Sequence, residues 1–209
     1  PATAVALVGS TTNPAAASPA AFSRTAVSLR LVIVNFTICS VPTLPLRSPD
    51  GSAASTTGEF ARCSNARRSS ARASALVMTA PGIPMIFQGQ EFLQGDWFDD
   101  TVPLDWDLRK DFRGIVQLYR DLIDLRLNRG GVTAGLSGRG FQVLLRDDDR
   151  KLLVFRRFHD GGDPGVIVAV NLRTEPAHDI RFALPDAGPW HLRLNSDWCG
   201  YSRDFDGFD

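Results

Sequence analysis

The first 76 residues of this 209-residue sequence lack lysine, histidine, tryptophan and tyrosine altogether. They hold two acidic residues, Asp50 and Glu59, against seven arginines. Alanine, serine, threonine and proline fill 42 of these 76 positions, and no helical or strand periodicity lasts beyond a few residues. Such a segment buries too little apolar surface to offset its chain entropy, so we expect residues 1–76 to be disordered.

Two origins are open for residues 1–76. The segment is either a natural disordered arm rich in alanine and serine, or the product of a shifted reading frame in GC-rich DNA. Sequence rich in arginine, alanine, serine and proline but free of lysine is typical of off-frame GC-rich codons. The composition also changes abruptly near Leu76. We therefore favour the shifted frame.

Cysteine and long apolar runs are also scarce. The three cysteines, Cys39, Cys63 and Cys199, are odd in number and show no C-x-x-C spacing, so neither a disulfide framework nor a metal site is indicated. The longest early apolar run, Leu31–Val34, is far too short to span a bilayer. No charged leader with a following apolar region opens the sequence, so we expect a cytoplasmic location.

The formal net charge is zero, which argues against nucleic acid or an anionic membrane as a partner. The zero is an average, because residues 1–76 sum to about +5 and the remainder to about −5. An acidic second part that contains all the tryptophans suits a neutral polyhydroxylated ligand. Nothing in the sequence indicates an oligomeric state.

A short apolar run, Ile83–Phe87, follows Pro81-Gly82 and leads directly into a glycine-rich, acidic loop that contains Trp97 and Trp106. This pattern is typical of the last strand of a parallel barrel, where the strand delivers a loop to a substrate cleft. A helix is predicted after Lys110. Its apolar stripe has helical spacing and comprises Ile115, Leu118, Tyr119, Leu122, Ile123 and Leu125.

Asn128–Gly131 predicts the end of this helix, and a pair between Arg120 and Asp124 is expected on its surface. From Phe141 onward the pattern changes to short strands separated by turns. They are predicted at residues 141–146, 152–158, 166–172, 179–184 and 191–195. Five antiparallel strands over about 70 residues indicate a small β-sandwich, which needs a neighbour to complete its core.

Several phrases occur in order: Pro84–Phe92 (PMIFQGQEF), Pro103–Trp106 (PLDW), Phe112–Ile115 (FRGI), Tyr119–Ile123 (YRDLI) and Leu194–Trp198 (LNSDW). In these phrases the sequence resembles the bacterial 1,4-α-glucan branching enzymes of the α-amylase superfamily, from about Leu76 to Asp209. The resemblance implies an α/β barrel remnant, the last strand and helix of a (β/α)₈ barrel, in residues 77–131. An all-β sandwich in residues 138–209 would follow, after the disordered amino-terminal segment 1–76.

The resemblance also implies an activity without a cofactor. Branching enzymes transfer α-1,4-glucan segments to a glucan 6-hydroxyl in glycogen synthesis, through a retaining double displacement between carboxylates about 5–5.5 Å apart. The resemblance implies that these two carboxylates, and a third, transition-state Asp, come from earlier barrel strands. The third Asp would stand in an Asn/Ser-His-Asp setting upstream of the Pro-Gly-Ile-Pro strand. No histidine precedes His159 here. We therefore assign no catalytic residue, and expect the chain alone to be inactive.

Substrate-binding candidates lie where the predicted strand ends. Gln88, Gln90 and Glu91 are expected near the glucan cleft, or else they tie the strand end to a neighbouring loop. Trp97, like Phe98 and Trp106, has an aromatic face suited to the C–H face of glucose, or packs the loop onto the barrel.

Other candidates have a simpler interpretation. Asp99-Asp100 is expected to be a solvated turn and Asp147–Asp149 a hairpin tip, with calcium unsupported by any loop pattern. His159, His178 and His191 are isolated, and Trp190 and Trp198 are expected to pack the sandwich. Two alternative functions stay open: part of an α-amylase-type glycoside hydrolase, or a non-catalytic glucan-binding module.

Overall fold

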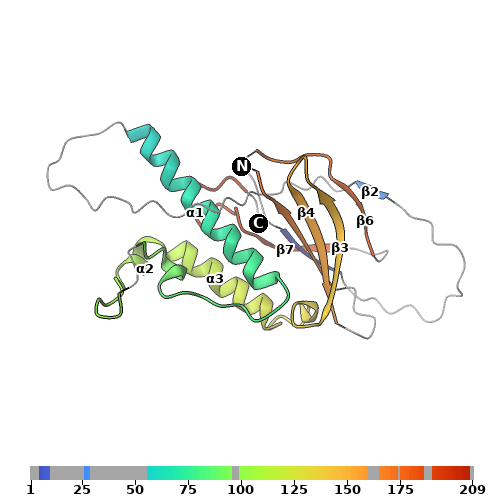
Figure 1. The fold of residues 1–209 in the computed structure, drawn as a ribbon, viewed down its shortest axis with the longest axis horizontal. Coiled ribbons are helices and arrows are strands. Elements are labelled where there is room, and N and C mark those ends of the chain that lie inside the picture. Colours follow the sequence, from blue (N-terminus) through green and yellow to red (C-terminus); the bar gives the residue numbers. More distant parts are fainter. Residues whose placement is uncertain are drawn as a thin grey trace, which may run out of the picture.

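Figure 1 shows the computed structural model, in which two long helices lie on one side of a β-sheet. The structure describes residues 5–9, 26–28, 56–95, 99–159, 165–173, 175–185 and 190–207, with side chains from residue 65 onward. No helix in this described part is both long and apolar enough to cross a membrane.

Helix α1 (Thr56–Thr79) lies where disorder was expected, so this part of the expectation for residues 1–76 differs from the structure. Alanine is the best helix former, and α1 contains several alanines. Its small buried residues Ala71 and Ala75, together with Met78, have helical spacing and share a core with helix α3 (Arg113–Arg126). The apolar residues that pack against α1 therefore include residues of α3. The sequence of residues 56–79 alone does not indicate this packing.

Two further parts of residues 1–76 form strands, β1 (Val5–Gly9) and β2 (Ala26–Ser28). The remaining positions before Thr56 lie outside the described residues, so the two origins proposed for this segment stay open there.

Helix α3 confirms the predicted helix and its apolar stripe. A short helix, α2 (Leu108–Asp111), directly precedes it. Asn128 and Gly131 follow α3 with left-handed φ angles of 53° and 71°, as expected for the end of the helix. Four stripe residues are buried and the other two are partly buried: Ile115, Leu118, Tyr119, Leu122, and then Ile123 and Leu125.

The expected surface pair between Arg120 and Asp124 is replaced by another. The Asp124 carboxylate lies 2.6 Å from the guanidinium of Arg129, which follows the helix. Because Arg129 lies beyond the helical part of the chain, helical spacing did not predict this pair.

The five predicted strands are confirmed to within a few residues. Their bounds are β3 (Gly140–Asp147), β4 (Leu152–Phe158), β5 (Val166–Asn171), β6 (Arg181–Ala183) and β7 (Trp190–Asn195). The main sheet has the order β3-β4-β5-β1-β7, and all its neighbours are antiparallel. The remaining strand, β6, pairs with β2 in a second sheet of two strands.

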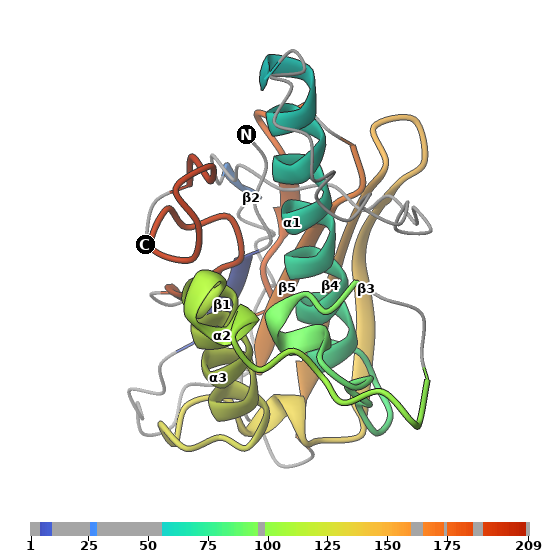
Figure 2. The same ribbon diagram turned by 90° about the vertical axis from the view of Figure 1, so that its left-hand side faces the viewer.

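Strand β5 separates two apolar cores, since its side chains alternate between the faces of the sheet. Val168 faces the helices and shares a core with Leu76 of α1 and Leu125 of α3. Ile167 faces the second sheet and packs with Phe182 of β6. Figures 1 and 2 show the resulting order of layers: α1 and α3 cover one face of the main sheet, and β6 lies beyond the other. The β-sandwich thus has the neighbouring core that its small size requires.

The predicted barrel strand does not form. Residues 83–87 belong to no helix or strand, and the Ile83 and Met85 side chains are 99% and 75% exposed. A strand in a parallel sheet requires hydrogen-bonded neighbours on its edges, and the described part of the chain supplies none. Of the barrel remnant predicted in residues 77–131, the helix is present and the strand is not.

Candidate functional site

The turn that contains the candidate binding residues is defined by Gly89. This glycine has a φ of 74°, and a Cβ atom on it would lie 2.5 Å from the Cβ atom of Gln94. Only glycine adopts this conformation readily at such a close approach. The single 3₁₀ turn η1 (Gln90–Phe92) follows, so the chain reverses directly after Gln88.

The structure places the candidate residues at different depths. Gln88 is exposed, whereas Gln90 and Glu91 are half-buried. Trp97 lies outside the described residues, as does the neighbouring Phe98. Their proposed contacts with glucan stay predictions.

Two amides close the turn. The Gln90 side-chain oxygen accepts a hydrogen bond from the backbone N–H of Phe87 at 3.2 Å. The Gln94 side-chain oxygen accepts one from the backbone N–H of Asp105 at 3.1 Å, which ties the turn to the Pro-Leu-Asp-Trp phrase. The Gln90 contact lies within the turn itself, and the contact with the neighbouring loop comes from Gln94, so both interpretations of the candidate residues stay predictions.

Phe92 and Tyr119 fix the turn to the helices. Phe92 is fully buried, and its ring centroid lies 5.3 Å from that of Trp106. The Tyr119 hydroxyl on α3 lies 2.5 Å from the hydroxyl of Ser74 on α1, and the two share a hydrogen bond. Burial raises the pKa of Tyr119, and the nearby Glu91 carboxylate raises it further. Glu91 is therefore close to the junction of both helices.

Trp106 is the described aromatic residue of the loop that a ligand could reach. It is 56% exposed, and the Arg109 guanidinium lies 5.6 Å from its ring centroid. One ring face is thus occupied by a cation, while the ring also packs beside Phe92 in a tilted arrangement. Trp106 therefore contacts Phe92 within the loop, and its contact with a sugar stays a prediction.

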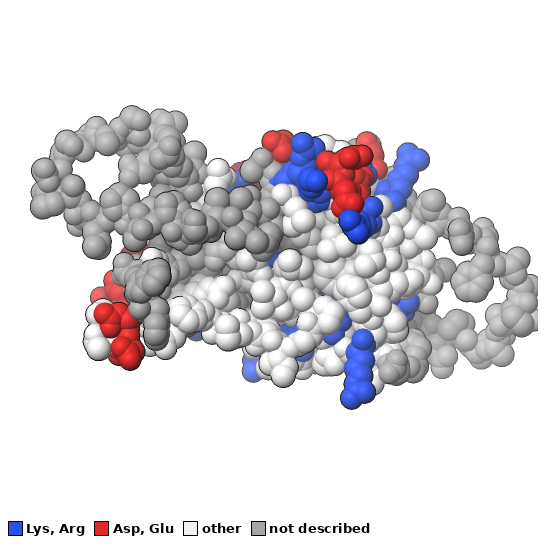
Figure 3. Space-filling view, viewed as in Figure 1, with Lys and Arg blue, Asp and Glu red and all other residues white. Residues whose placement is uncertain are grey.

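The acidic pairs behave as turns. The Asp99 carboxylate accepts hydrogen bonds from Thr101 at 2.9 Å and 2.6 Å, and these bonds lower the pKa of Asp99. At the β3–β4 hairpin, ion pairs of 2.8 Å join Asp147 to Arg150 and Asp148 to Arg146. Figure 3 likewise shows acidic and basic side chains beside one another near one edge, with a largely uncharged middle to this face.

The three histidines lie at the surface. His159, His178 and His191 are all exposed. Within the part that the structure describes, no three His, Cys, Asp or Glu side chains are grouped as metal ligands would be.

Trp190 packs against the sandwich core as expected, but Trp198 packs against the helix core, edge-on to Tyr201 at 5.0 Å. The expectation for Trp198 was wrong because the chain turns back toward the helices after β7.

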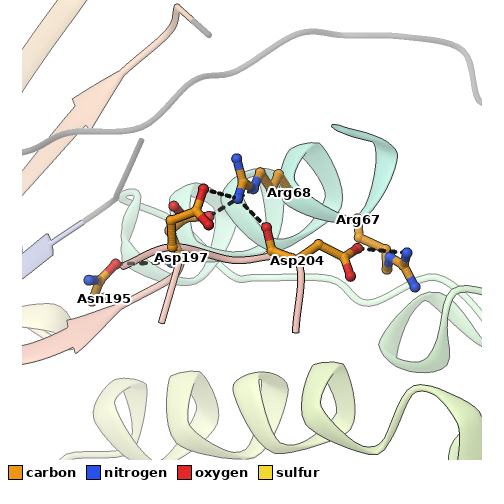
Figure 4. A network of polar contacts seen from close by, with 6 residues as sticks. Arg67, Arg68, Asn195, Asp197 and Asp204 are labelled. Carbon is orange, nitrogen blue, oxygen red and sulfur yellow. Dashed lines mark hydrogen bonds and ion pairs between the residues drawn. The ribbon is translucent and has the colours of Figure 1, made fainter. Parts of the chain in front are cut away.

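A network of arginine and aspartate residues joins α1 to the segment after β7 (Figure 4). Arg68 lies 3.2 Å from the carboxylate of Asp197 and 2.8 Å from that of Asp206. Arg67 lies 2.6 Å from Asp204. The partners are more than 100 residues apart, so no local motif indicates them. Asp197 lies inside the Leu-Asn-Ser-Asp-Trp phrase that carries the family resemblance, but the phrase does not indicate its ion pair.

The charged groups at the centre of this network are buried, so loss of one charge would leave its partner unpaired away from water. Asp197 is 1% exposed, and Arg72, one helical turn beyond Arg68, is 5% exposed. Burial lowers the pKa of Arg72 to about 10, while the Asp197 carboxylate acts in the opposite direction. Because the carboxylates of Asp197 and Asp204 are already paired with guanidinium groups, they are structural groups here and not free acids or bases.

Two more arginines bind the end of α1. Arg126 of α3 donates to the carbonyl oxygens of Met78 and Ala80 at 3.1 Å and 2.9 Å. Arg157 of β4 donates to the carbonyl oxygen of Thr79 at 2.8 Å. A helix leaves its last carbonyl groups without helical partners, and cations are favourable at this end of the helix dipole. The start of the Pro81–Gln88 segment is thereby fixed by both α3 and the sheet.

Residues 144–207 match the family model described as alpha amylase, C-terminal all-beta domain. The β-domain is similar to that of α-amylases. The matched range contains β4 to β7 and the second half of β3, together with the segment that holds Asp197 and Asp204. This similarity supports membership of the α-amylase superfamily. No solved structure gives a significant match to the chain.

The matched range starts after α3, so it includes none of Gln88, Gln90 and Glu91. The α-amylase-type β-domain is consistent with a carbohydrate ligand.

Tyr201 provides a test of how this β-domain is joined to α3. Its hydroxyl donates to the Asp121 carboxylate at 2.6 Å, and burial together with this carboxylate raises the pKa of Tyr201 well above its ordinary value. A raised pKa in the folded state means that the neutral phenol stabilises the fold. This stability is fully present below the ordinary tyrosine pKa of about 10 and is lost as pH rises above it.

We therefore expect the stability difference between the wild-type protein and Tyr201→Phe to be constant from pH 7 to 9 and to shrink above pH 10. Urea unfolding at a series of pH values measures this difference. A difference that stays constant up to pH 11 would contradict the proposed role of the hydroxyl.

Proposed function

We propose that this chain is part of a glucan branching enzyme, an enzyme that transfers α-1,4-glucan segments to a 6-hydroxyl in glycogen synthesis. The main support is the α-amylase-type β-domain, which directly follows a helix and turn with branching-enzyme phrases. The proposed partner is an α-1,4-glucan, no cofactor takes part, and a cytoplasmic location stays a prediction.

We further propose that the chain on its own is inactive. The retaining reaction requires two carboxylates on opposite sides of one glycosidic bond. Among the described carboxylates of this loop, those of Asp99 and Asp105 accept hydrogen bonds within their own turns, and Glu91 lies half-buried near Tyr119. The exposed apolar side chains of Ile83 and Met85 are those that a barrel would cover.

Two other functions remain candidates. An α-amylase-type hydrolase would use the same β-domain and the same barrel, with water as the acceptor. The Pro84–Phe92 and Pro103–Trp106 phrases favour branching over hydrolysis. A non-catalytic glucan-binding module belongs to a different class, and the well-formed β-domain would then act without the barrel.

Sequencing the coding DNA through codon 76 tests the branching-enzyme proposal. We expect one of the three frames to encode an Asn/Ser-His-Asp phrase upstream of the codons for Ala75–Thr79. If no frame encodes it, the proposal is contradicted, and the glucan-binding module becomes the better account.

Affinity electrophoresis in gels that contain glycogen tests the module directly. A non-catalytic module is expected to migrate more slowly as glycogen increases, without altering the polymer. Unchanged mobility contradicts the module and leaves the inactive part of an enzyme. An albumin lane controls for gel sieving.

A further inference from the structure

The main sheet contains a central strand that the β-domain's own sequence does not supply. Strand β1 lies between β5 and β7 and pairs with both. It lies before α1, whereas the other four strands of this sheet all follow α3. The β-domain therefore requires a segment that is distant in sequence to make its sheet continuous.

The topology leaves a gap for one strand. Because β1 is antiparallel to β5 and to β7, these two strands run parallel to each other. Between them the chain forms β6, which belongs to the second sheet. Neighbouring strands lie about 4.8 Å apart, so without β1 the β5 and β7 backbones would stand at roughly twice that spacing.

An empty gap would be costly. All six residues of β5 are buried, and they contribute to the cores on both faces of the sheet. Without β1, the N–H and C=O groups on one edge of β5 would lose their partners in an apolar environment, and unpaired buried backbone groups are strongly unfavourable. The backbone N–H and C=O groups of β5 and β7 thus line the two edges of the gap, and apolar cores lie above and below it.

The segment that fills the gap has a suitable sequence. Val5–Val8 is an uninterrupted apolar run, and residues 2–13 contain neither proline nor a charged residue. The register is specific: Leu7 lies opposite Ile167 of β5 and Leu192 of β7, with a bulge between Ala6 and Leu7 on the β7 side. A central strand requires an N–H group at each paired position, which this run provides.

We propose that the gap between β5 and β7 is a strand-binding groove, whose ligand is a single extended apolar peptide that runs antiparallel to both strands. In this chain the occupant is residues 5–9 of the same molecule. The mode is β-strand addition, in which backbone hydrogen bonds supply affinity and the flanking apolar side chains supply specificity. Long connections add little closure entropy, so the distance in sequence is no obstacle.

The test uses the full chain with Leu7→Pro. Proline removes an N–H group from the middle of β1 and is excluded from central strands, so the variant releases the segment and empties the groove. A fluorescent peptide with the sequence of residues 1–10 is then titrated against both proteins and followed by anisotropy. We expect the variant to bind this peptide at least tenfold more tightly than the wild-type chain, whose groove is filled.

Two controls separate the groove from general damage. Ile83→Pro places the same residue in an exposed segment outside any strand, and it is expected to behave as the wild type. A peptide that itself contains proline at the position of Leu7 is expected not to bind the variant. Equal binding of both peptides, or equal affinity of both proteins for the unmodified peptide, would overturn the proposal.

If Leu7→Pro does not fold, amide hydrogen exchange of the wild-type chain decides the question. The amides of residues 5–9 are expected to exchange as slowly as those of β5 and β7. Fast exchange of residues 5–9 beside a protected β5 would overturn the proposal. A wild-type dimer that dissociates on Leu7→Pro substitution would assign the occupant to a second copy and contradict binding within one chain.

Discussion

Replacing Asp197 with alanine is expected to lower the free energy of unfolding by about 3–5 kcal/mol, the usual cost of removing one partner of a buried ion pair. The Asp197 side chain is 1% exposed, and its partner Arg68 is 12% exposed. The substitution would leave the positive charges of Arg68 and the buried Arg72 without their nearest common carboxylate. Denaturant unfolding of the two proteins measures the loss.

Asp148→Ala is the matched control. It removes an ion pair of 2.8 Å to Arg146, but both side chains are about 70% exposed. Exposed pairs contribute about 0–1 kcal/mol because water and salt screen them. Similar losses for Asp197→Ala and Asp148→Ala would contradict the conclusion that the buried network joins α1 to the β-domain.

Replacing Arg157 with methionine is expected to cost about 3 kcal/mol or more, because charge-assisted hydrogen bonds are strong and their buried acceptors would stay unsatisfied. Arg157 is 2% exposed. Besides the Thr79 carbonyl, it donates to the carbonyl oxygens of Leu136 and Gly138 at 3.0 Å and 2.7 Å. One side chain thus joins α1, the η2 turn (Ala134–Leu136) and strand β4.

Arg139→Met provides the comparison for Arg157, since Arg139 is exposed and lies only just before β3. Its replacement is expected to change stability by less than about 0.5 kcal/mol, as for most surface substitutions. If urea unfolding shows an equally small loss of stability for Arg157→Met, the hydrogen bonds of Arg157 do not hold the end of α1 in place.

Local patterns predicted the elements that depend on local properties. The stripe from Ile115 to Leu125 identified α3, and turn residues such as Asp147–Arg150 marked the strand ends. Both features arise from residues close together in sequence. For the same reason the strands from β3 to β7 were predicted, whereas the strands that residues 5–9 and 26–28 add to the two sheets were not.

Long-range features were not predictable in the same way. Residues 83–87 can form a strand only where neighbouring strands pair with them. The apolar run itself does not show whether such neighbours are present. The pairing of Arg68 with Asp206 spans 138 residues, and neither residue has a distinctive local setting. Helix α1 has a buried face of small residues, so its packing against α3 left only a weak periodic signal.

The candidate turn lies between these two cases. Gly89 lies at a close approach to Gln94, as its residue type favours, whereas the burial of Phe92 was not predicted. Whether Gln88, Gln90 and Glu91 bind glucan depends on which groups face them across the cleft, and a local sequence pattern does not indicate those groups.

Product analysis of amylose incubated with the chain is the most direct test of the central claim, that this is an inactive part of an α-glucan-converting enzyme. Iodine colour, reducing ends and the proton resonances of α-1,6 linkages are measured, with an active branching enzyme as the positive control. The account predicts that all three stay unchanged. New α-1,6 linkages, or a rise in reducing ends, would contradict it.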